Sequence, residues 1–247
     1  MFRFLMILLV VANASPTWAA EPARDTLYLT ITLRAAPGQL KALIADHRAL
    51  KEAGYYAASG RHQPLIMRHS QGDQWDLMLL EPIGSYGAFF GADRLVLAEA
   101  ARIEFADQLK TRNARIAYRA ELFAFGPSAE FTNTHVGDAK FFHIEMFDAL
   151  PALKDKLLEQ REMENVYLEA TKRRGNLIFT GDRGTNVDAF TIGAYENLAA
   201  FAARPDLEEG QSLAAAKKAG FEDDNSIGFY LRELISAHHD TLANLIE

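Results

Sequence analysis

Short segments of the chain alternate between apolar and polar residues, and the longer segments between them repeat apolar residues every three or four positions. The first pattern is typical of a strand with one buried face, and the second of an amphipathic helix. In the first half they predict strands at 28–33, 65–69, 75–81 and 116–125, with helices at about 37–50 and 85–110. In the second half they predict strands at 142–146, 177–181, 187–193 and 227–235, with helices at about 151–167 and 196–219. Each half therefore has the order β-α-β-β-α-β.

The two halves also match in sequence, at an offset of 112 residues that carries Glu52 onto Glu164. The identical pairs are Glu52/Glu164, Tyr55/Tyr167, Ala58/Ala170, Arg61/Arg173, Leu65/Leu177, Ile66/Ile178, Gly72/Gly184, Asp76/Asp188, Ala88/Ala200, Phe89/Phe201 and, further on without a gap, Asn113/Asn225, Tyr118/Tyr230, Glu121/Glu233 and Leu122/Leu234. A sustained period of this kind indicates an internal duplication. We therefore predict two tandem repeats, at 26–126 and 139–247, joined by a linker at 127–138.

The predicted element order is that of a ferredoxin-like unit, with four antiparallel strands and both helices on one face of the sheet. The other face, which we expect to carry Trp75, Leu77 and Leu79, cannot remain in water, and two such sheets in one chain can cover each other. The chain resembles the dimeric α+β-barrel superfamily, in which two ferredoxin-like units pack sheet to sheet, here fused in tandem as in chlorite-dismutase-like proteins. Among single-unit relatives it is similar to the antibiotic-biosynthesis monooxygenase, NIPSNAP and EthD-like groups. The predicted fold class is α+β, with two tandem ferredoxin-like repeats forming a pseudo-dimeric barrel.

Residues 1–19 have the pattern of a secretory signal peptide. Arg3 precedes an apolar run at 4–12, and small residues precede a predicted cleavage site at Ala19. The run is too short to span a bilayer, so membrane insertion is not expected. The pattern predicts a periplasmic or secreted protein, and the alternative is a buried N-terminal helix.

Composition narrows the classes of partner. The chain has 33 Asp and Glu residues against 26 Lys and Arg residues, whereas nucleic-acid binding needs clustered positive charge. No P-loop, GxSxG or HExxH motif is present, which disfavours a serine hydrolase or a zinc protease. We therefore expect a small organic ligand and no nucleic acid. Both a monomer and a homodimer are permitted, since the duplication supplies the second sheet while edge strands could still pair between chains.

Polar residues on the two opening strands are the first candidates for a site. We expect the apolar residues Leu29, Ile31 and Leu33, and likewise Phe142, Ile144 and Met146, to face the helices, which leaves their polar neighbours facing the barrel. His143 and Glu145 are two residues apart on a strand, so they can act together as general base and orienting carboxylate, or as two metal ligands. A polar pair at the mouth of the barrel is the alternative. The predicted catalytic residues are His143 and Glu145, the predicted cavity residues are Thr30, Thr32, Trp75, Thr191, Tyr230 and Arg232, and no metal-ligand set is assigned.

Two further histidine positions have simpler interpretations. His47 lies on the buried stripe of the first helix, where packing in the core is expected. The sequence His238-His239-Asp240 looks like a metal motif. Adjacent residues on a helix point about 100° apart, however, so a solvated or capping role is expected.

The resemblance implies an enzyme that works without a bound cofactor, holding an acidic substrate in an apolar cavity beside a histidine or tyrosine. The predicted function is an exported small-molecule-binding barrel protein, of the cofactor-independent oxygenase or isomerase type, with His143 as base, Glu145 as its orienting partner and Trp75 as a cavity wall. No cofactor is expected, although the fused relatives admit a haem or a metal ion. The alternative is a non-catalytic periplasmic binding or stress-associated module whose barrel is filled by side chains.

Overall fold

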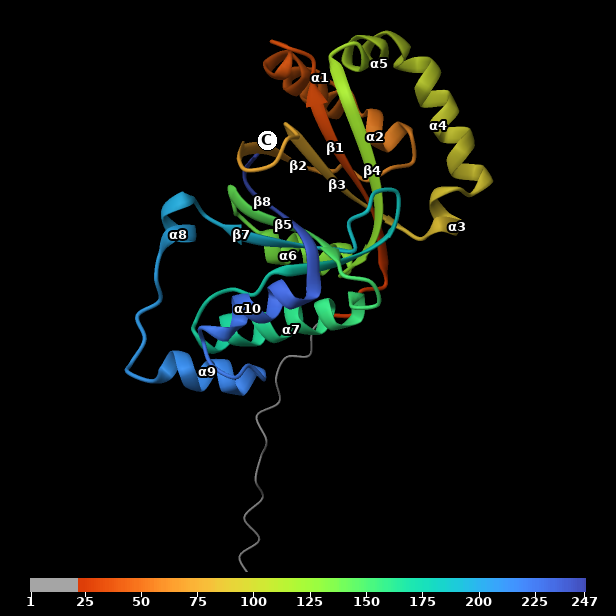
Figure 1. Cartoon of the computed structure of the whole chain (residues 1–247). Coiled ribbons are helices and arrows are strands. Elements are labelled where there is room, and N and C mark those ends of the chain that lie inside the picture. Colours follow the sequence, from red (N-terminus) through yellow and green to blue (C-terminus); the bar gives the residue numbers. More distant parts are fainter. Residues whose placement is uncertain (1–21) are drawn as a thin grey trace, which may run out of the picture.

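The computed structural model describes residues 22–247, so the predicted signal peptide at 1–19 lies outside the described residues. An eight-stranded antiparallel sheet closes into a barrel, and the helices lie outside it (Figure 1). The first repeat supplies β1 (Thr26–Ala35), β2 (Leu65–Gln71), β3 (Leu77–Gly84) and β4 (Ile116–Gly126), and the second supplies β5 (Phe141–Ala149), β6 (Leu177–Arg183), β7 (Ala189–Tyr195) and β8 (Ile235–Leu245).

The two repeats are joined through their strands. The order around the barrel is β1-β3-β2-β8-β5-β7-β6-β4, so that β2 pairs with β8 and β4 pairs with β6. The predicted pseudo-dimeric barrel of two ferredoxin-like units is confirmed. The closed ladder pairs each described strand with two neighbours, which leaves less strand edge for the pairing between chains that a homodimer would allow.

Most helices form two groups at opposite ends of the molecule (Figure 1). The first repeat has α1 (Leu40–Glu52), α2 (Tyr55–Ala58), α3 (Tyr86–Phe89), α4 (Ala92–Glu104) and α5 (Ala106–Asn113), and the second has α7 (Lys154–Ala170), α8 (Leu198–Ala202), α9 (Gln211–Ala219) and α10 (Ser226–Leu234). A further helix, α6 (Ala129–Val136), lies in the predicted linker, and α6 and α8 lie between the two groups (Figure 1). No helix within residues 22–247 is both long and apolar enough to cross a bilayer.

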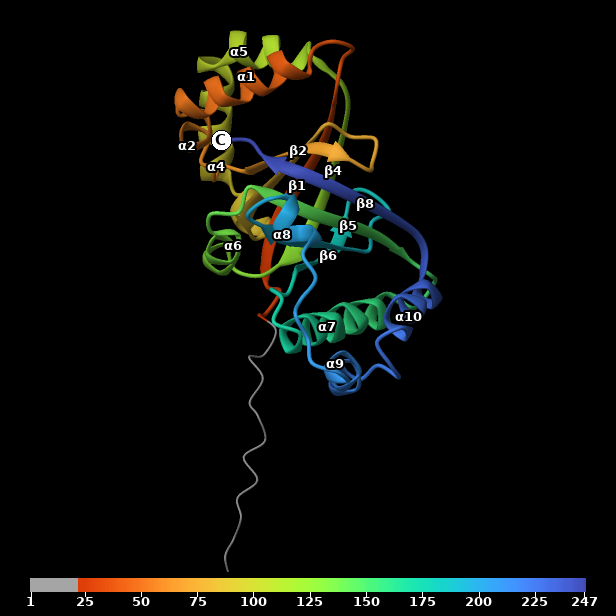
Figure 2. The same cartoon turned by 90° about the vertical axis from the view of Figure 1, so that its left-hand side faces the viewer.

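The predicted second helix of each repeat is divided into shorter pieces. In the second repeat α8 ends at Ala202, and an irregular segment containing Pro205 precedes α9. Proline lacks the backbone N–H that a helix interior needs, which favours a break there. As a result α9 packs against α7 as an outer layer (Figure 2).

The interior of the barrel is filled with apolar side chains from both repeats. The cluster includes Tyr28, Met67, Trp75, Met78, Leu80, Leu122, Ala124, Phe142, Ile144, Met146, Leu177, Phe179, Phe190, Ile192 and Ala243. The rings of Phe179 and Phe190 stack with centroids 4.5 Å apart, and Tyr28 packs edge-on to Phe179 at 5.1 Å. The Tyr28 hydroxyl donates to the carbonyl of Pro127 at 2.8 Å. The predicted ligand cavity between the two sheets is therefore replaced by a packed core.

The second repeat has the opposite facing from the prediction on β5 and β7. Phe142, Ile144 and Met146 point into the barrel, together with Phe190 and Ile192. The prediction assumed that apolar residues must face the helices, but the filled barrel is itself an apolar environment for these side chains.

The polar neighbours of these residues consequently lie on the outer face. His143 and Glu145 line a pocket beside α7, and Thr191 hydrogen-bonds Glu145 there. In the first repeat Thr30 lies on the barrel side as predicted, because Leu29 and Ile31 pack with Leu43 of α1. Leu77 and Leu79 of β3 also face α1, although the prediction placed them inside the barrel.

The last strand of the second repeat begins later than predicted. Ala35 pairs with Ile116 in the first repeat, and Ala149 pairs with Ile235 in the second, so this strand is offset by 119 residues, seven more than the repeat offset of 112. Residues 226–234 form α10 instead of a strand. The reason is a helical stripe at Ile227, Tyr230, Leu231 and Leu234, spaced i, i+3, i+4 and i+7, which packs towards α7. Tyr230 and Arg232 therefore lie on a helix and not in the barrel.

Candidate functional site

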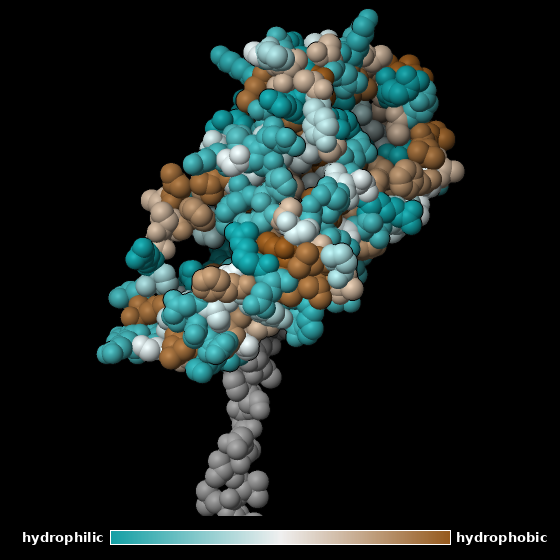
Figure 3. Space-filling model, in the orientation of Figure 1, coloured by the Kyte–Doolittle hydropathy of each residue, from teal (hydrophilic) through white to brown (hydrophobic). Residues whose placement is uncertain are grey.

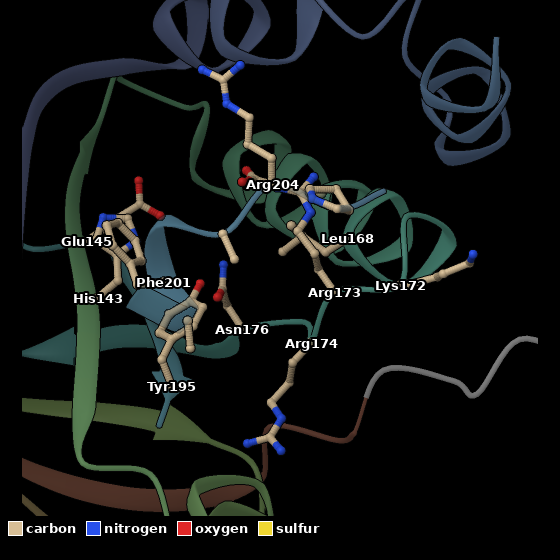
Figure 4. A pocket seen from close by; sticks show the side chains of 14 residues that line it. His143, Glu145, Leu168, Lys172, Arg173, Arg174, Asn176, Tyr195, Phe201 and Arg204 are labelled. Carbon is tan, nitrogen blue, oxygen red and sulfur yellow. The ribbon is translucent and has the colours of Figure 1, made fainter. Parts of the chain in front are cut away.

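A pocket of about 450 Å³ lies on the outer face of the second repeat, and we call it the outer pocket (Figure 4). It is lined by β5, β7, α7, the loop that follows α7, α8 and the segment that follows α8. The surface is hollowed where this segment runs from α8 towards α9 (Figure 3). The lining includes His143, Glu145, Glu164, Leu168, Lys172, Arg173, Arg174, Asn176, Tyr195, Phe201 and Arg204.

His143 is held in this pocket by a carboxylate from the neighbouring strand. Because Glu145 of β5 pairs with Asp240 of β8, the side chains of His143 and Asp240 share the outer face. The His143 Nε2 and Asp240 Oδ1 atoms are 2.6 Å apart, and the imidazole ring packs against Phe201 with centroids 5.0 Å apart. Within residues 22–247 the Nδ1 atom has no hydrogen-bond partner. The geometry leaves Nδ1 available as a proton acceptor, with Asp240 positioned to orient the ring and stabilise its protonated form.

Glu145 is a fixed anion next to this pair. Its carboxylate accepts a hydrogen bond from Thr191 Oγ1 at 3.2 Å, and it lies 3.2 Å from His238 Nε2 and 3.6 Å from a guanidinium nitrogen of Arg161. Burial raises the pKa of Glu145, but the hydrogen bond from His238 and the positive charge of Arg161 outweigh it, and the resulting pKa is about 2. The structure thus assigns the contact that orients His143 to Asp240, and not to Glu145 as the sequence suggested.

Arg161 of α7 lies behind the pocket, and its positive charge balances the carboxylates of Glu145 and Glu164. Its side chain is buried, contacts Glu164 at 2.6 Å and lies over the ring of Phe147 at 4.8 Å. Burial raises the pKa of Glu164, while the charge of Arg161 acts in the opposite direction. A buried arginine held by two carboxylates and an aromatic ring is a rigid support for the wall of the pocket.

The other predicted site residues are divided between two places. Thr30, Thr32 and Trp75 come together at one mouth of the barrel, in a smaller pocket of about 130 Å³ that His239 also lines. We call this the barrel-mouth pocket. Tyr230 and Arg232, on α10, line neither pocket.

Sequence reasoning missed Asp240 and His238, because their segment was interpreted as a helix end. The segment is β8, and on a strand alternate residues share a face, so His238 and Asp240 lie beside Glu145 and His143. The alternation of Thr241, Ala243 and Leu245 with their neighbours is a weak strand signal that could have placed them.

A metal ion is geometrically possible at this position. Donor atoms of His143, Glu145 and Asp240 all lie within 4.8 Å of one another, a mixed nitrogen and oxygen set that suits a divalent transition metal. These side chains are nevertheless satisfied by one another, by His238 and by Thr191, and Arg161 already supplies a positive charge.

Comparison with known proteins identifies the fold. No family model matches the chain, and no curated protein matches it. Among solved structures, an anthrone oxidase-like protein is similar with a TM-score of 0.57 and 11% identity, over 91% of this chain and 92% of that chain. A candidate monooxygenase from Lactobacillus acidophilus has a TM-score of 0.53 and 12% identity over 90% and 95% of the two chains, and one from Fusobacterium nucleatum has 0.51 and 10% over 90% and 93%. The chain thus has the fold of the dimeric α+β-barrel superfamily, in a tandem form.

In the outer pocket, the Nε2 atom of His143 does not fit as the axial ligand of a haem, the group that the fused relatives suggested. An axial histidine needs clear space in front of its ligating nitrogen. His143 is the one histidine that lines the outer pocket, its Nε2 has Asp240 in front of it at 2.6 Å, and Phe201 covers its ring. Helix α7 presents Glu164 and Leu168 to the pocket and contains no histidine.

Proposed function

We propose that this chain is a small-molecule enzyme of the cofactor-independent oxygenase or isomerase type, with its active site in the outer pocket. The observation that supports it is the hydrogen bond between His143 and Asp240 at the wall of a pocket of about 450 Å³. A pocket of this volume is within the range that small-molecule ligands occupy. His143 is the base, and the charges of Asp240 and Glu145 stabilise its protonated form.

The chemistry that follows is proton removal from a carbon next to a carbonyl group. The proton passes to Nδ1 of His143 and leaves an enolate on the substrate, whose ring packs on Phe201 and Tyr195. In an isomerase, His143 returns the proton to a different carbon. In an oxygenase, the enolate reduces dioxygen and combines with it to form a peroxide anion. This anion takes up the proton from His143 to become a hydroperoxide, which loses water to give a second carbonyl group.

Anthrone is a suitable probe, because one of the similar structures is described as anthrone oxidase-like. Its oxidation consumes one dioxygen and yields anthraquinone and water, which absorbance follows directly. We expect His143→Ala to lower kcat/KM by about 100-fold or more, the usual contribution of a general base, and Asp240→Asn to cause a smaller loss. The Tm of His143→Ala should stay close to that of the wild type, because the ring is not part of the packed core.

His239→Gln is the matched control. His239 neighbours Asp240 in sequence but lines the barrel-mouth pocket, so this variant should turn over anthrone at the wild-type rate. Full activity in His143→Ala, or an equal loss in His239→Gln, would contradict the proposed site. Dialysis against EDTA should leave the rate unchanged. Loss of activity that a divalent cation restores would transfer the chemistry to a metal held by His143, Glu145 and Asp240.

The filled barrel interior favours a second candidate, a non-catalytic binding module. Such a protein would bind anthrone in the outer pocket without forming anthraquinone. Calorimetric binding in the absence of turnover would distinguish this function from the enzyme.

We also propose that the protein is exported to the periplasm or secreted. The pattern of residues 1–19 supports this, since a charged residue, a short apolar run and a small-residue site follow in order. The N-terminal sequence of the protein isolated from the cells that produce it should begin at Ala20. A chain that retains Met1 and remains in the cytoplasm would contradict the proposal.

A further inference from the structure

The outer pocket has a positively charged rim. Lys172, Arg173, Arg174 and Arg204 line it, on the side away from His143 and Glu145 (Figure 4). Within residues 22–247 none of these four side chains forms an ion pair with a carboxylate. Arg173 donates to the Thr171 hydroxyl at 3.1 Å and Arg174 to the carbonyl of His135 at 2.9 Å, and both of these partners are uncharged.

Lys172 occupies a backbone position that a glycine would fill more easily. Its φ is +60°, in the left-handed region, directly after α7 ends. The matching residue of the first repeat, at the offset of 112, is Gly60 with a φ of +64°. A residue with a side chain is strained in this region, and such strain is found preferentially where the side chain has a function. The second repeat therefore places a lysine at the pocket in spite of the backbone it requires.

The inner wall of the pocket differs from the rim, because it carries aromatic rings and negative charge. Tyr195 and Phe201 pack edge to face with centroids 5.2 Å apart, and the carboxylate of Glu145 lies on the same side as His143 (Figure 4). Burial raises the pKa of the Tyr195 hydroxyl, and the charge of Arg173 acts against this rise, so Arg173 influences the interior of the pocket as well as its edge. An anionic group would be repelled by the carboxylate of Glu145 and attracted to the rim.

We infer that the outer pocket takes an aromatic carboxylate, whose ring packs on Phe201 and Tyr195 and whose anionic group lies at the positively charged rim. This deepens the proposed function, because it names the class of ligand for the same pocket. It also fixes the direction of binding, since the end of the molecule opposite the carboxylate is the end that reaches His143.

The test compares 2-naphthoate with 2-naphthamide, its uncharged analogue of similar shape, by calorimetry on the full chain. We expect 2-naphthoate to bind about tenfold more tightly at low salt, the effect of several exposed charges acting together. In 1 M NaCl the preference should largely disappear, because the Debye length falls to about 3 Å.

Lys172→Gly separates binding from folding. This variant should weaken 2-naphthoate binding by about threefold, leave 2-naphthamide binding unchanged and raise the Tm by about 2 °C, because glycine relieves the left-handed backbone. Lys41→Gln is the control for loss of one positive charge, since Lys41 lies exposed on α1 at the other end of the molecule (Figure 1). It should change neither affinity.

The inference is overturned by equal affinities for the two probes, by failure of 2-naphthoate to bind at millimolar concentration, or by Lys172→Gly raising the Tm without weakening binding. Anthrone carries no charge, so its turnover does not depend on the rim. Turnover that requires His143, without a preference for 2-naphthoate, would remove this inference alone. A preference for 2-naphthoate with turnover that does not require His143 would remove only the proposed function.

Discussion

His47 shows how a single buried side chain makes stability depend on pH. It is 1% exposed on α1, and neither ring nitrogen has a hydrogen-bond partner among the described residues. Burial lowers its pKa to about 4, and the charges of Arg112 and Arg119 act in the same direction. The folded protein therefore keeps the ring neutral in a pH range where the unfolded chain, with an ordinary histidine pKa near 6.5, is protonated.

The expected result is a loss of stability as the pH falls from about 6.5 to about 4, of up to about 3 kcal/mol, with no further contribution from His47 below that range. Above pH 6.5 the ring is neutral in both states and contributes no slope. Urea unfolding of the wild type and of His47→Leu across this range measures the difference. An equal slope in the two proteins would assign the pH dependence to other groups.

At the residue scale, the sequence predicts the position of a side chain correctly where only one face of its helix or strand can be buried. The core position of His47 was predicted correctly, because an apolar stripe on a helix has a single buried face. His143 and Glu145 were selected as a pair for a sound reason, their spacing on a strand, but both faces of β5 are covered by protein, so alternation alone could not show which face was the barrel. Asp240 lay beyond sequence reasoning, since its contact with His143 depends on the register between β5 and β8.

At the element scale, two equivalent hairpin glycines fix the last strand of each repeat. Gly72 and Gly184 both have a φ of +119°, and a Cβ at either would lie 2.0 Å from a backbone oxygen, that of Asp240 for Gly72 and that of Glu121 for Gly184. Each hairpin therefore lies directly on a strand of the barrel, β8 in one case and β4 in the other. Of these two strands, only β8 carries a residue of the outer-pocket site, Asp240.

This difference leads to a paired prediction. Gly72→Ala and Gly184→Ala should each lower the free energy of unfolding by about 3 kcal/mol or more, because the backbone must move to relieve the clash. At a temperature where both variants remain folded, Gly72→Ala should also lower anthrone turnover, since it displaces Asp240, whereas Gly184→Ala should not. Equal turnover in the two variants would show that Asp240 tolerates displacement of β8.

The order of elements was predictable because the chain contains two copies of the same unit, whose sequences can be compared. The first seven strands lie close to their predicted positions, and the hairpins at Gly72 and Gly184 lie where the shared glycines indicated. The eighth strand was misplaced because the alignment was continued without a gap through Tyr230, where the second repeat inserts α10. A helical stripe and an alternating strand pattern are hard to distinguish over nine residues.

At the scale of the whole molecule, the two repeats should unfold as one unit. Strands β2 and β8, and β4 and β6, are paired between repeats, and the apolar interior takes side chains from both. Neither repeat can lose its structure without exposing the inner face of the other. Scanning calorimetry should therefore show one transition with equal calorimetric and van't Hoff enthalpies, and two separate transitions would show that the repeats are independent.

The architecture followed from the duplication together with the need to cover an apolar sheet face, and both were visible in the sequence. The location of the pocket was not visible. It depends on α9 packing against α7 instead of against the sheet, which is decided by tertiary contacts around the segment that contains Pro205.

The two seams between the repeats are short compared with the pairing of β1 with β4, and no hairpin turn joins their strands as one joins β2 to β3 and β6 to β7. Heat or mutation should therefore open the molecule along β2–β8 and β4–β6 first. Because both repeats have the same architecture, two opened molecules could exchange halves and re-form both seams between different chains. The fused barrel thus carries a built-in route to domain-swapped oligomers, whose formation would depend on protein concentration and on how long the seams stay open.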